Sequence, residues 1–223
     1  MAGFKGVVRL FPLPNLVLFP HVVQGLHIFE PRYRQMTADA LAGDKLIALA
    51  LLQPGWEAAY EGTPAIYPVA CLGKIITDQR LADGRFNLLL RGLSRIRIVQ
   101  EVSQKKLYRC ARVELLQDAS VPEPAEAVRM RRLLAERVNV WLPAEEVVLD
   151  QFRQLLDSEL TLGTICDIFS FALPLDVEFK QRVLEELHVE QRAGRLLSYL
   201  KEHKPPIPKP PADHKFPPDF SAN

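Results

Sequence analysis

The hydrophobic pattern of the chain changes its period near residue 118, and this change constrains the fold more than any other feature. Before it, apolar and polar residues alternate, most clearly in the stretch 85–91. After it, apolar residues recur every three or four positions, beginning at Ala127. A period of two is typical of strands with one buried face, and a spacing of three to four is typical of amphipathic helices. The sequence therefore predicts an α+β protein in which the strands come first and the helices second.

Charge and proline content divide the chain at similar places. Residues 1–116 hold 15 basic and 9 acidic residues, whereas residues 117–223 hold 13 basic and 18 acidic residues. Seven of the 18 prolines lie in the last twenty residues, a composition that opposes both helix and central strand. We therefore expect a β domain over 1–118, a helical bundle over 119–203, and an extended or disordered proline-rich tail over 204–223.

Several short strands and one helix are predicted within the β domain. We expect a strand over 7–11 that ends at Pro12, because proline cannot donate to a strand ladder. The stretch 32–42 has one apolar face and predicts a short helix. Strands over 69–77 and 85–91 are joined by an Asp-Gly pair, a strong turn signal. Short strands with proline and glycine at the corners favour a strongly bent sheet or partial barrel.

Overall composition excludes several classes of protein. Lys and Arg together number 28 and Asp and Glu 27, so the net charge does not attract the chain to nucleic acid or to a membrane surface. The longest apolar run, 46–52, is far shorter than the roughly 20 residues that a membrane-spanning helix needs. Three cysteines lie far apart in the sequence, which suggests reduced thiols in a cytoplasmic protein.

Catalytic motifs are missing from the sequence. There is no phosphate-binding GxxxxGK[ST] loop, no GxGxxG, no HExxH, no CxxC and no GxSxG, and we expect no enzyme activity, cofactor or metal site. A hydrolase would have to use Cys166, with Asp167 beside it and His188 recruited in space, or a serine such as Ser94. Burial of Cys166 as a small apolar residue on a helix face is the favoured interpretation, since free cysteine is commonly buried.

Arginines alternate with apolar residues along two consecutive predicted strands. Arg85, Arg95 and Arg97 are expected to face solvent or the helical domain, and they could contact RNA or an acidic ligand. Alternatively, they form the wet face of a half-buried sheet, because nucleic-acid recognition also needs aromatic stacking. The apolar residues expected to share one buried core are Phe86, Leu88, Leu90, Ile96 and Ile98.

Three groups of residues form specific motifs. The first is LFPLPNLVLFP at 10–20 followed by LHIFEPRYR at 26–34. The second is GKII at 73–76, LADGRFNL at 81–88 and RGLSRIRI at 91–98. The third is FALPLDVEFKQRVLEEL at 171–187. In this order they resemble the Lon protease N-terminal (substrate-binding) domain family, and in particular its stand-alone bacterial members. Two positions depart from the family pattern: His21 stands where glycine is common, and Gly25 stands where proline is common.

The resemblance implies a PUA-like bent β pseudobarrel with one short helix, followed by a C-terminal helical bundle. It also implies a module that binds unfolded polypeptide or a protein partner and works with proteolysis. The ATPase and protease domains of Lon have no counterpart in this sequence, so catalysis does not carry over. RNA binding is the alternative, by analogy with PUA domains.

A polypeptide-binding module needs an apolar groove or an exposed strand edge. The candidate surface is the proline-bounded segment of Leu16, Val17, Leu18 and Phe19. The alternative is that these four residues pack beneath the sheet.

Overall fold

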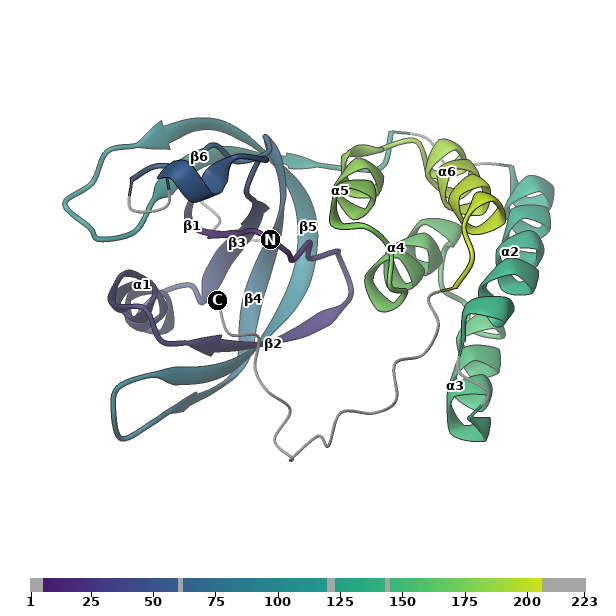
Figure 1. Ribbon diagram of the computed structural model, residues 1–223, viewed down its shortest axis with the longest axis horizontal. Coiled ribbons are helices and arrows are strands. Elements are labelled where there is room, and N and C mark those ends of the chain that lie inside the picture. The colour runs from purple at the N-terminus through teal and green to yellow at the C-terminus, as the bar shows by residue number, and fades with distance from the viewer. Residues whose placement is uncertain (1–5, 60–61, 120–122, 143–144, 206–223) are drawn as a thin grey trace. The chain divides into compact units, whose positions relative to one another are not determined.

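The chain divides between Leu116 and Gln117 into two compact units. The computed structural model describes residues 6–59, 62–119, 123–142 and 145–205. Over these residues, unit 1 contains the strands and helix α1, whereas unit 2 contains helices α2 to α6 (Figure 1). The predicted α+β class is therefore confirmed, and the units meet two residues before the boundary expected from the sequence.

Unit 1 is built on one bent, mixed sheet. Its elements are β1 (Val7–Leu13), β2 (Val23–Ile28), α1 (Pro31–Leu41), β3 (Leu46–Leu51), the 3-10 turn η1 (Trp56–Ala59), β4 (Val69–Arg80), β5 (Phe86–Val102) and β6 (Cys110–Leu116). The strand order is β2-β5-β4-β3-β1-β6, and the long strand β5 also pairs with β6, so the sheet curves back on itself. The β1–β3 pair is parallel, and the other named pairs are antiparallel.

Strand β1 runs two residues further than the sequence predicted. Pro12 lies inside it, in register with Ala50 of β3. The pairing of β1 with β6 covers only Val7 to Arg9, so beyond Arg9 the strand has one neighbour within the sheet. A proline is tolerated there because its missing N–H leaves no ladder position unfilled on the open side. The prediction that Pro12 ends the strand was wrong for this reason.

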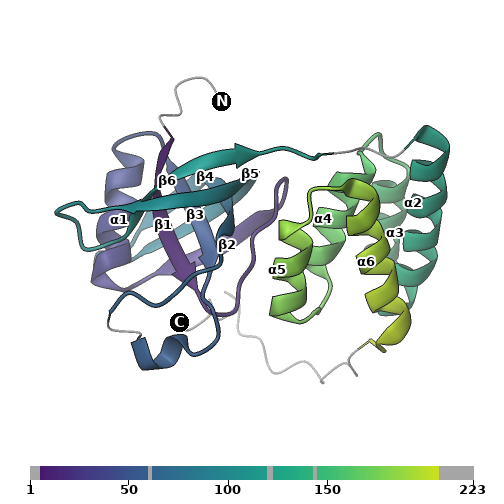
Figure 2. The same cartoon turned by 90° about the horizontal axis from the view of Figure 1, so that it is seen from above.

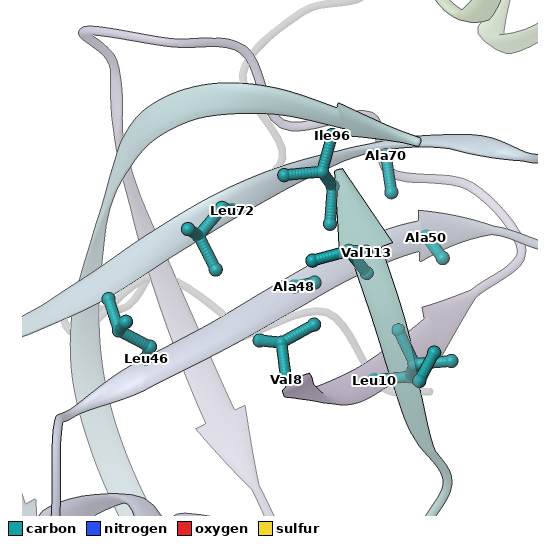
Figure 3. Packing of buried hydrophobic residues seen from close by; sticks show 10 residues of the cluster. Val8, Leu10, Leu46, Ala48, Ala50, Ala70, Leu72, Ile96 and Val113 are labelled. Carbon is teal, nitrogen blue, oxygen red and sulfur yellow. The ribbon is translucent and has the colours of Figure 1, made fainter. Parts of the chain in front are cut away.

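A dry core fills the inner face of the bent sheet (Figure 3). It is entirely apolar and draws on β1, β3, β4, β5 and β6; its members are Val8, Leu10, Leu46, Ala48, Ala50, Ala70, Leu72, Ile96, Ala111 and Val113. Four of these are alanines. Small side chains placed among leucine and valine let a narrow, curved sheet close over its own interior without voids.

A bulge in β5 changes which face its side chains occupy. Leu72 of β4 pairs with Ser94, but the next residue, Gly73, pairs with Gly92, which leaves Leu93 as an extra residue. One inserted residue reverses the alternation that follows it. Leu90 and Ile96 are both fully buried, yet they lie on opposite faces of the sheet.

The expectation of a single core for the apolar residues of β5 was therefore wrong. The buried residues Phe86, Leu88 and Leu90 precede the bulge, whereas Ile96 follows it and joins the inner core. Arg95 is in register with the fully buried Cys71 and is itself only 4% exposed. Arg95 was expected to face solvent or the helical domain, and it does not face solvent. The alternation had been extended through the bulge, which places Arg95 on the same side of the sheet as Leu90.

Unit 2 is all-helical over its described residues (Figure 2). Its elements are α2 (Pro124–Val138), the 3-10 turn η2 (Asn139–Trp141), α3 (Glu146–Leu156), α4 (Leu162–Ala172), α5 (Val177–Glu185) and α6 (Val189–Glu202). Helix α6 packs against α2, α4 and α5. The ring of Tyr199 on α6 stacks on Phe179 and on His203, with ring centroids 4.1 and 4.0 Å apart.

One arginine is fully buried within unit 2. The Nη2 atom of Arg192 donates to Asp118, and its Nε atom donates to the carbonyl of Glu186 at 2.9 Å. Its Nη1 atom lies 3.5 Å from a carboxylate oxygen of Asp167, which is also buried. Buried charges persist in proteins when they are paired and hydrogen-bonded. Arg192 thus ties the start of unit 2 to helices α4 and α6.

Candidate functional site

The proline-bounded segment does not form an exposed surface. Leu16 is half-buried, while Val17, Leu18 and Phe19 are 3%, 1% and 0% exposed. The backbone continues against Gly92, whose carbonyl accepts from His21 N at 3.0 Å and whose N–H donates to Val22 O at 2.9 Å. The prediction that these side chains offer an open apolar groove was wrong, because they pack inside unit 1.

Gly92 makes this packing possible. A Cβ atom at position 92 would lie 1.9 Å from the carbonyl oxygen of Phe19, which is far inside van der Waals contact. The next turn also has an unusual backbone, because His21 has a φ of 68°. Non-glycine residues rarely adopt this left-handed conformation. The family that the sequence resembles commonly has glycine at this position, and glycine adopts this backbone conformation more easily than histidine does.

The three arginines proposed for RNA contact are not brought together as one exposed patch. Arg85 is exposed, but its Nε atom donates to Asp83 at 2.6 Å. Arg97 is exposed, and Arg95 is buried. A basic surface for a phosphate backbone needs several accessible charges on one face. The structure therefore gives the nucleic-acid alternative no specific support.

Residues of the hydrolase alternative have structural partners. Cys166 is fully buried in α4, and the adjacent Asp167 pairs with Arg192. His188 contacts Glu186 through Nδ1 at 3.2 Å, and Ser94 donates to the carbonyls of its neighbours on β5 and β6. Over the described residues, no group of three or more His, Cys, Asp or Glu is arranged to hold a metal ion. These contacts favour structural roles for all four residues.

A polar pocket of about 370 Å³ lies beside α1 in unit 1. Lys106 and Tyr108 both donate to one oxygen of Asp39, at 2.8 and 2.7 Å, and these bonds lower the pKa of Asp39. Burial raises the pKa of the Cys110 thiol, which lines the same pocket and stays protonated at neutral pH. The charges of this pocket satisfy one another, so its contacts tie the segment between β5 and β6 to α1.

A second surface of unit 1 is formed by three neighbouring strands. Strands β4, β5 and β2 present three cross-strand rows on one face, which we call the three-row face. The rows are Lys74–Arg91–Val23, Thr77–Leu89–Gly25 and Gln79–Asn87–His27. Residues in direct register on neighbouring strands point to the same side of a sheet, so these nine residues share one surface.

Apolar side chains on this face are exposed. Val23 is 44% exposed and Leu89 is 41% exposed, and the bulged Ile76 next to them is 45% exposed. The wet side of an antiparallel sheet is normally polar. Gly25 leaves room between them: a Cβ atom at this position would be 3.8 Å from the Leu89 side chain. Gly25 therefore leaves the Leu89 side chain uncovered on the side of β2, at a position where the sequence had shown only a departure from the family's proline.

Strand β2 is also the end of the sheet order. Among the described strands it pairs only with β5, so its other edge has no strand partner there. On this edge the carbonyl of Gly25 accepts from the side chain of Gln24 at 2.6 Å. At the end of β2 lies a small crevice of about 20 Å³, lined by Phe11, Leu13, Leu26, His27, Ile28, Phe29, Glu30 and Tyr33. An unpaired strand edge beside exposed aliphatic side chains is suited to an extended peptide segment.

Together, the curved mixed sheet and the helices that follow it define an α+β protein whose accessible surface suits binding. The family model for the ATP-dependent protease La (LON) substrate-binding domain matches residues 7–202. The chain belongs to this family, and the resemblance seen in the sequence is confirmed.

Individual relatives agree with this assignment. The Lon protease of Dictyoglomus thermophilum is 24% identical over 87% of this chain, and the chain spans only 24% of that relative. The solved N-terminal domain of the Mycobacterium avium complex Lon protease superposes with a TM-score of 0.66 at 19% identity, covering 88% of this chain and 99% of that one. The Lon N-terminal domain protein from Xanthomonas campestris gives a TM-score of 0.62 at 22% identity, covering 86% and 98%. These two structures share the fold of the present chain.

Among the described residues, no helix is both long and apolar enough to cross a bilayer.

Proposed function

We propose that this chain is a non-catalytic module that binds polypeptide segments in extended conformation, and that β2 of unit 1 is the strand to which they add. The observation that carries the proposal is the open edge of β2 beside the exposed Val23 and Leu89. Main-chain hydrogen bonds to a strand edge give affinity without requiring a fixed sequence. A module that accepts many unfolded substrates needs this property.

Membership in the family supports the same conclusion, since the matched domain is named for substrate binding. We further propose that the chain performs this binding without ATPase or protease chemistry of its own. It would act in the cytoplasm beside a separate partner that handles the bound polypeptide. RNA binding is the less favoured function, because Arg95 is buried and Arg85 is paired with Asp83.

The proposal is tested by fluorescence anisotropy with a labelled, permanently unfolded polypeptide such as reduced and carboxymethylated α-lactalbumin. Wild-type protein should bind it saturably. The double variant Val23→Asn/Leu89→Asn should bind roughly fivefold or more weakly, because two exposed apolar contacts are lost.

A matched control is Val99→Asn. Val99 lies on the same strand as Leu89 and is 51% exposed, but it is outside the three-row face. Its affinity should equal that of the wild type. If the double variant and the control bind equally well while remaining folded, the assignment of the site to β2 is wrong.

A further inference from the structure

Two cations lie side by side on the three-row face. Lys74 and Arg91 are exposed and in direct cross-strand register. Within the described part of the chain, neither side chain makes a hydrogen bond or an ion pair. Like charges placed directly opposite each other destabilise a sheet. The fold thus keeps a like-charge pair on a surface where a neutral pair would be more stable.

Nearby carboxylates do not relieve this repulsion. On β4, Asp78 is in register with the buried Leu88 and so belongs to the opposite side of the sheet. In the turn that follows β4, Asp83 is held by the side chain and backbone of Arg85. Among the residues that the structure describes, no carboxylate pairs with Lys74 or Arg91, so an anionic group from a ligand could supply the opposite charge on this face.

The positions of the cations relative to the exposed Leu89 define a spacing. Leu89 and Arg91 are two residues apart on β5, which in a strand places them on the same side, about 6.6 Å apart. Leu89 shares its row with Gly25, and Arg91 shares its row with Val23. A segment added along β2 would run about 4.8 Å from it, with side chains two residues apart entering these two rows.

Each row then selects one kind of side chain. In the row of Gly25, no β2 side chain intervenes, so an aliphatic residue of the segment can reach Leu89. In the row of Val23, that valine lies between the segment and Arg91, and Lys74 is the next residue of the row. The side chain of Arg91 is longer than that of valine, so its guanidinium can reach past Val23 to a carboxylate on the segment. A carboxylate is favoured in that row.

We infer that the polypeptides preferred by this module contain an aliphatic residue and an acidic residue separated by one position, which contact Leu89 and Arg91 respectively. This inference rests on the proposed function and names its substrate class. A polypeptide fits better than RNA, because the cations are flanked by the aliphatic Val23, Leu89 and Ile76 rather than by the aromatic platforms on which bases stack.

The test uses three labelled peptides of twelve residues that differ at one type of position. Each carries alternating Thr-Leu-Thr-X repeats, with X as Asp, Asn or Lys. At about 0.1 M salt, the Asp peptide should bind about three- to tenfold more tightly than the Asn peptide, and the Lys peptide should bind most weakly. The ratio of the affinities for the Asp and Asn peptides should fall toward one at about 1 M salt, where charges are screened within about 3 Å.

Variants of the protein locate the effect. In Lys74→Gln/Arg91→Gln, the ratio of the affinities for the Asp and Asn peptides should fall to about one. The matched control is Arg97→Gln, an exposed cation on β5 outside the three-row face, which should keep the wild-type ratio. Thermal midpoints close to that of the wild type would show that each variant is folded.

The outcomes separate this inference from the proposed function. If the Asp and Asn peptides bind the wild type equally well, the charge preference is wrong and the polypeptide-binding function stands. If no peptide binds, both are wrong. The inference would also be overturned if Lys74→Gln/Arg91→Gln still bound the Asp peptide more tightly than the Asn peptide. A single-stranded RNA that displaces the Asp peptide and binds Val23→Asn/Leu89→Asn with unchanged affinity would overturn it as well.

Discussion

The two units of this chain are stabilised in different ways. The inner core of unit 1 contains only apolar side chains, and it joins strands that are far apart in the sequence. Unit 2 has apolar helix faces as well, but it also buries Arg192 against Asp118 and Asp167. An apolar core tolerates substitutions that keep its volume. A buried ion pair fixes one geometry, and it becomes costly when one partner is removed. The comparison predicts unequal responses to mutation.

The largest effect is expected at the buried arginine of unit 2. Arg192→Ala should lower the free energy of unfolding by about 3–5 kcal/mol, because it leaves the buried Asp167 without its charged partner. Urea unfolding followed by the fluorescence of Trp141, which is buried in this unit, measures the change. The control is Arg195→Ala on the same helix, whose side chain is 49% exposed where it pairs with Glu186. Because this cation is solvated, its removal should cost less than about 1 kcal/mol. Equal effects at the two arginines would remove the distinction between the units.

The next effect concerns two neighbouring leucines of unit 1. Leu88 is 3% exposed and Leu89 is 41% exposed. Leu88→Ala should cost about 2–5 kcal/mol of stability through the cavity it leaves, whereas Leu89→Ala should change stability by at most about 0.5 kcal/mol. Urea unfolding of both variants tests the register of β5. A loss below about 1 kcal/mol at Leu88 would mean that its face is assigned wrongly.

A smaller effect of backbone crowding is expected at Gly92. Gly92→Ala places a methyl group against the Phe19 carbonyl and should cost about 1–3 kcal/mol as an overpacking change. Gly194→Ala on α6 has no atom within 4 Å of the added carbon, so it should stabilise the helix by up to about 1 kcal/mol. Changes of the same sign in the thermal midpoints of both variants would contradict this contrast.

Sequence reasoning recovered the elements but not the details of β5. The period change, the Asp-Gly turn and the helix that begins at Pro31 all depend on local patterns, and the structure contains each of them. The bulge at Leu93 has no comparable local signal except Gly92, so the alternation was extended through it and Arg95 was placed on the wrong side. The apolar segment that ends at Phe19 is buried through its contact with Gly92. These residues are far apart in the sequence, so no local pattern predicts the contact.

The candidate site was missed for a related reason. Val23, Leu89 and Lys74 lie on three strands, and their common surface exists only once the strand order β2-β5-β4 is known. Each residue alone is an ordinary member of its strand. Knowledge of the pairing between 69–80 and 86–102 would have brought Lys74 and Arg91 together, but the sequence did not fix the position of β2 beside them.

The smallest change in stability is expected at His21, which precedes β2 and has a left-handed backbone conformation. His21→Gly removes the steric cost of a positive φ, of about 1–2 kcal/mol, but glycine also gains entropy in the unfolded chain. The net stabilisation should be below about 1 kcal/mol, seen as a small rise in the thermal midpoint. His21→Ala keeps the positive φ and lacks this gain. A His21→Gly variant less stable than His21→Ala would show that the imidazole has an essential contact.

The central claim is that an extended polypeptide adds to the open edge of β2. Amide hydrogen exchange of the full chain, with and without the Asp peptide, tests it most directly, because unpaired edge amides exchange quickly and become protected when a strand is added. The account predicts slower exchange at alternate amides of Val23–Ile28 when the peptide is bound, with little change in helices α2 to α6. Protection confined to those helices, or unchanged exchange in β2 at saturating peptide, would contradict it.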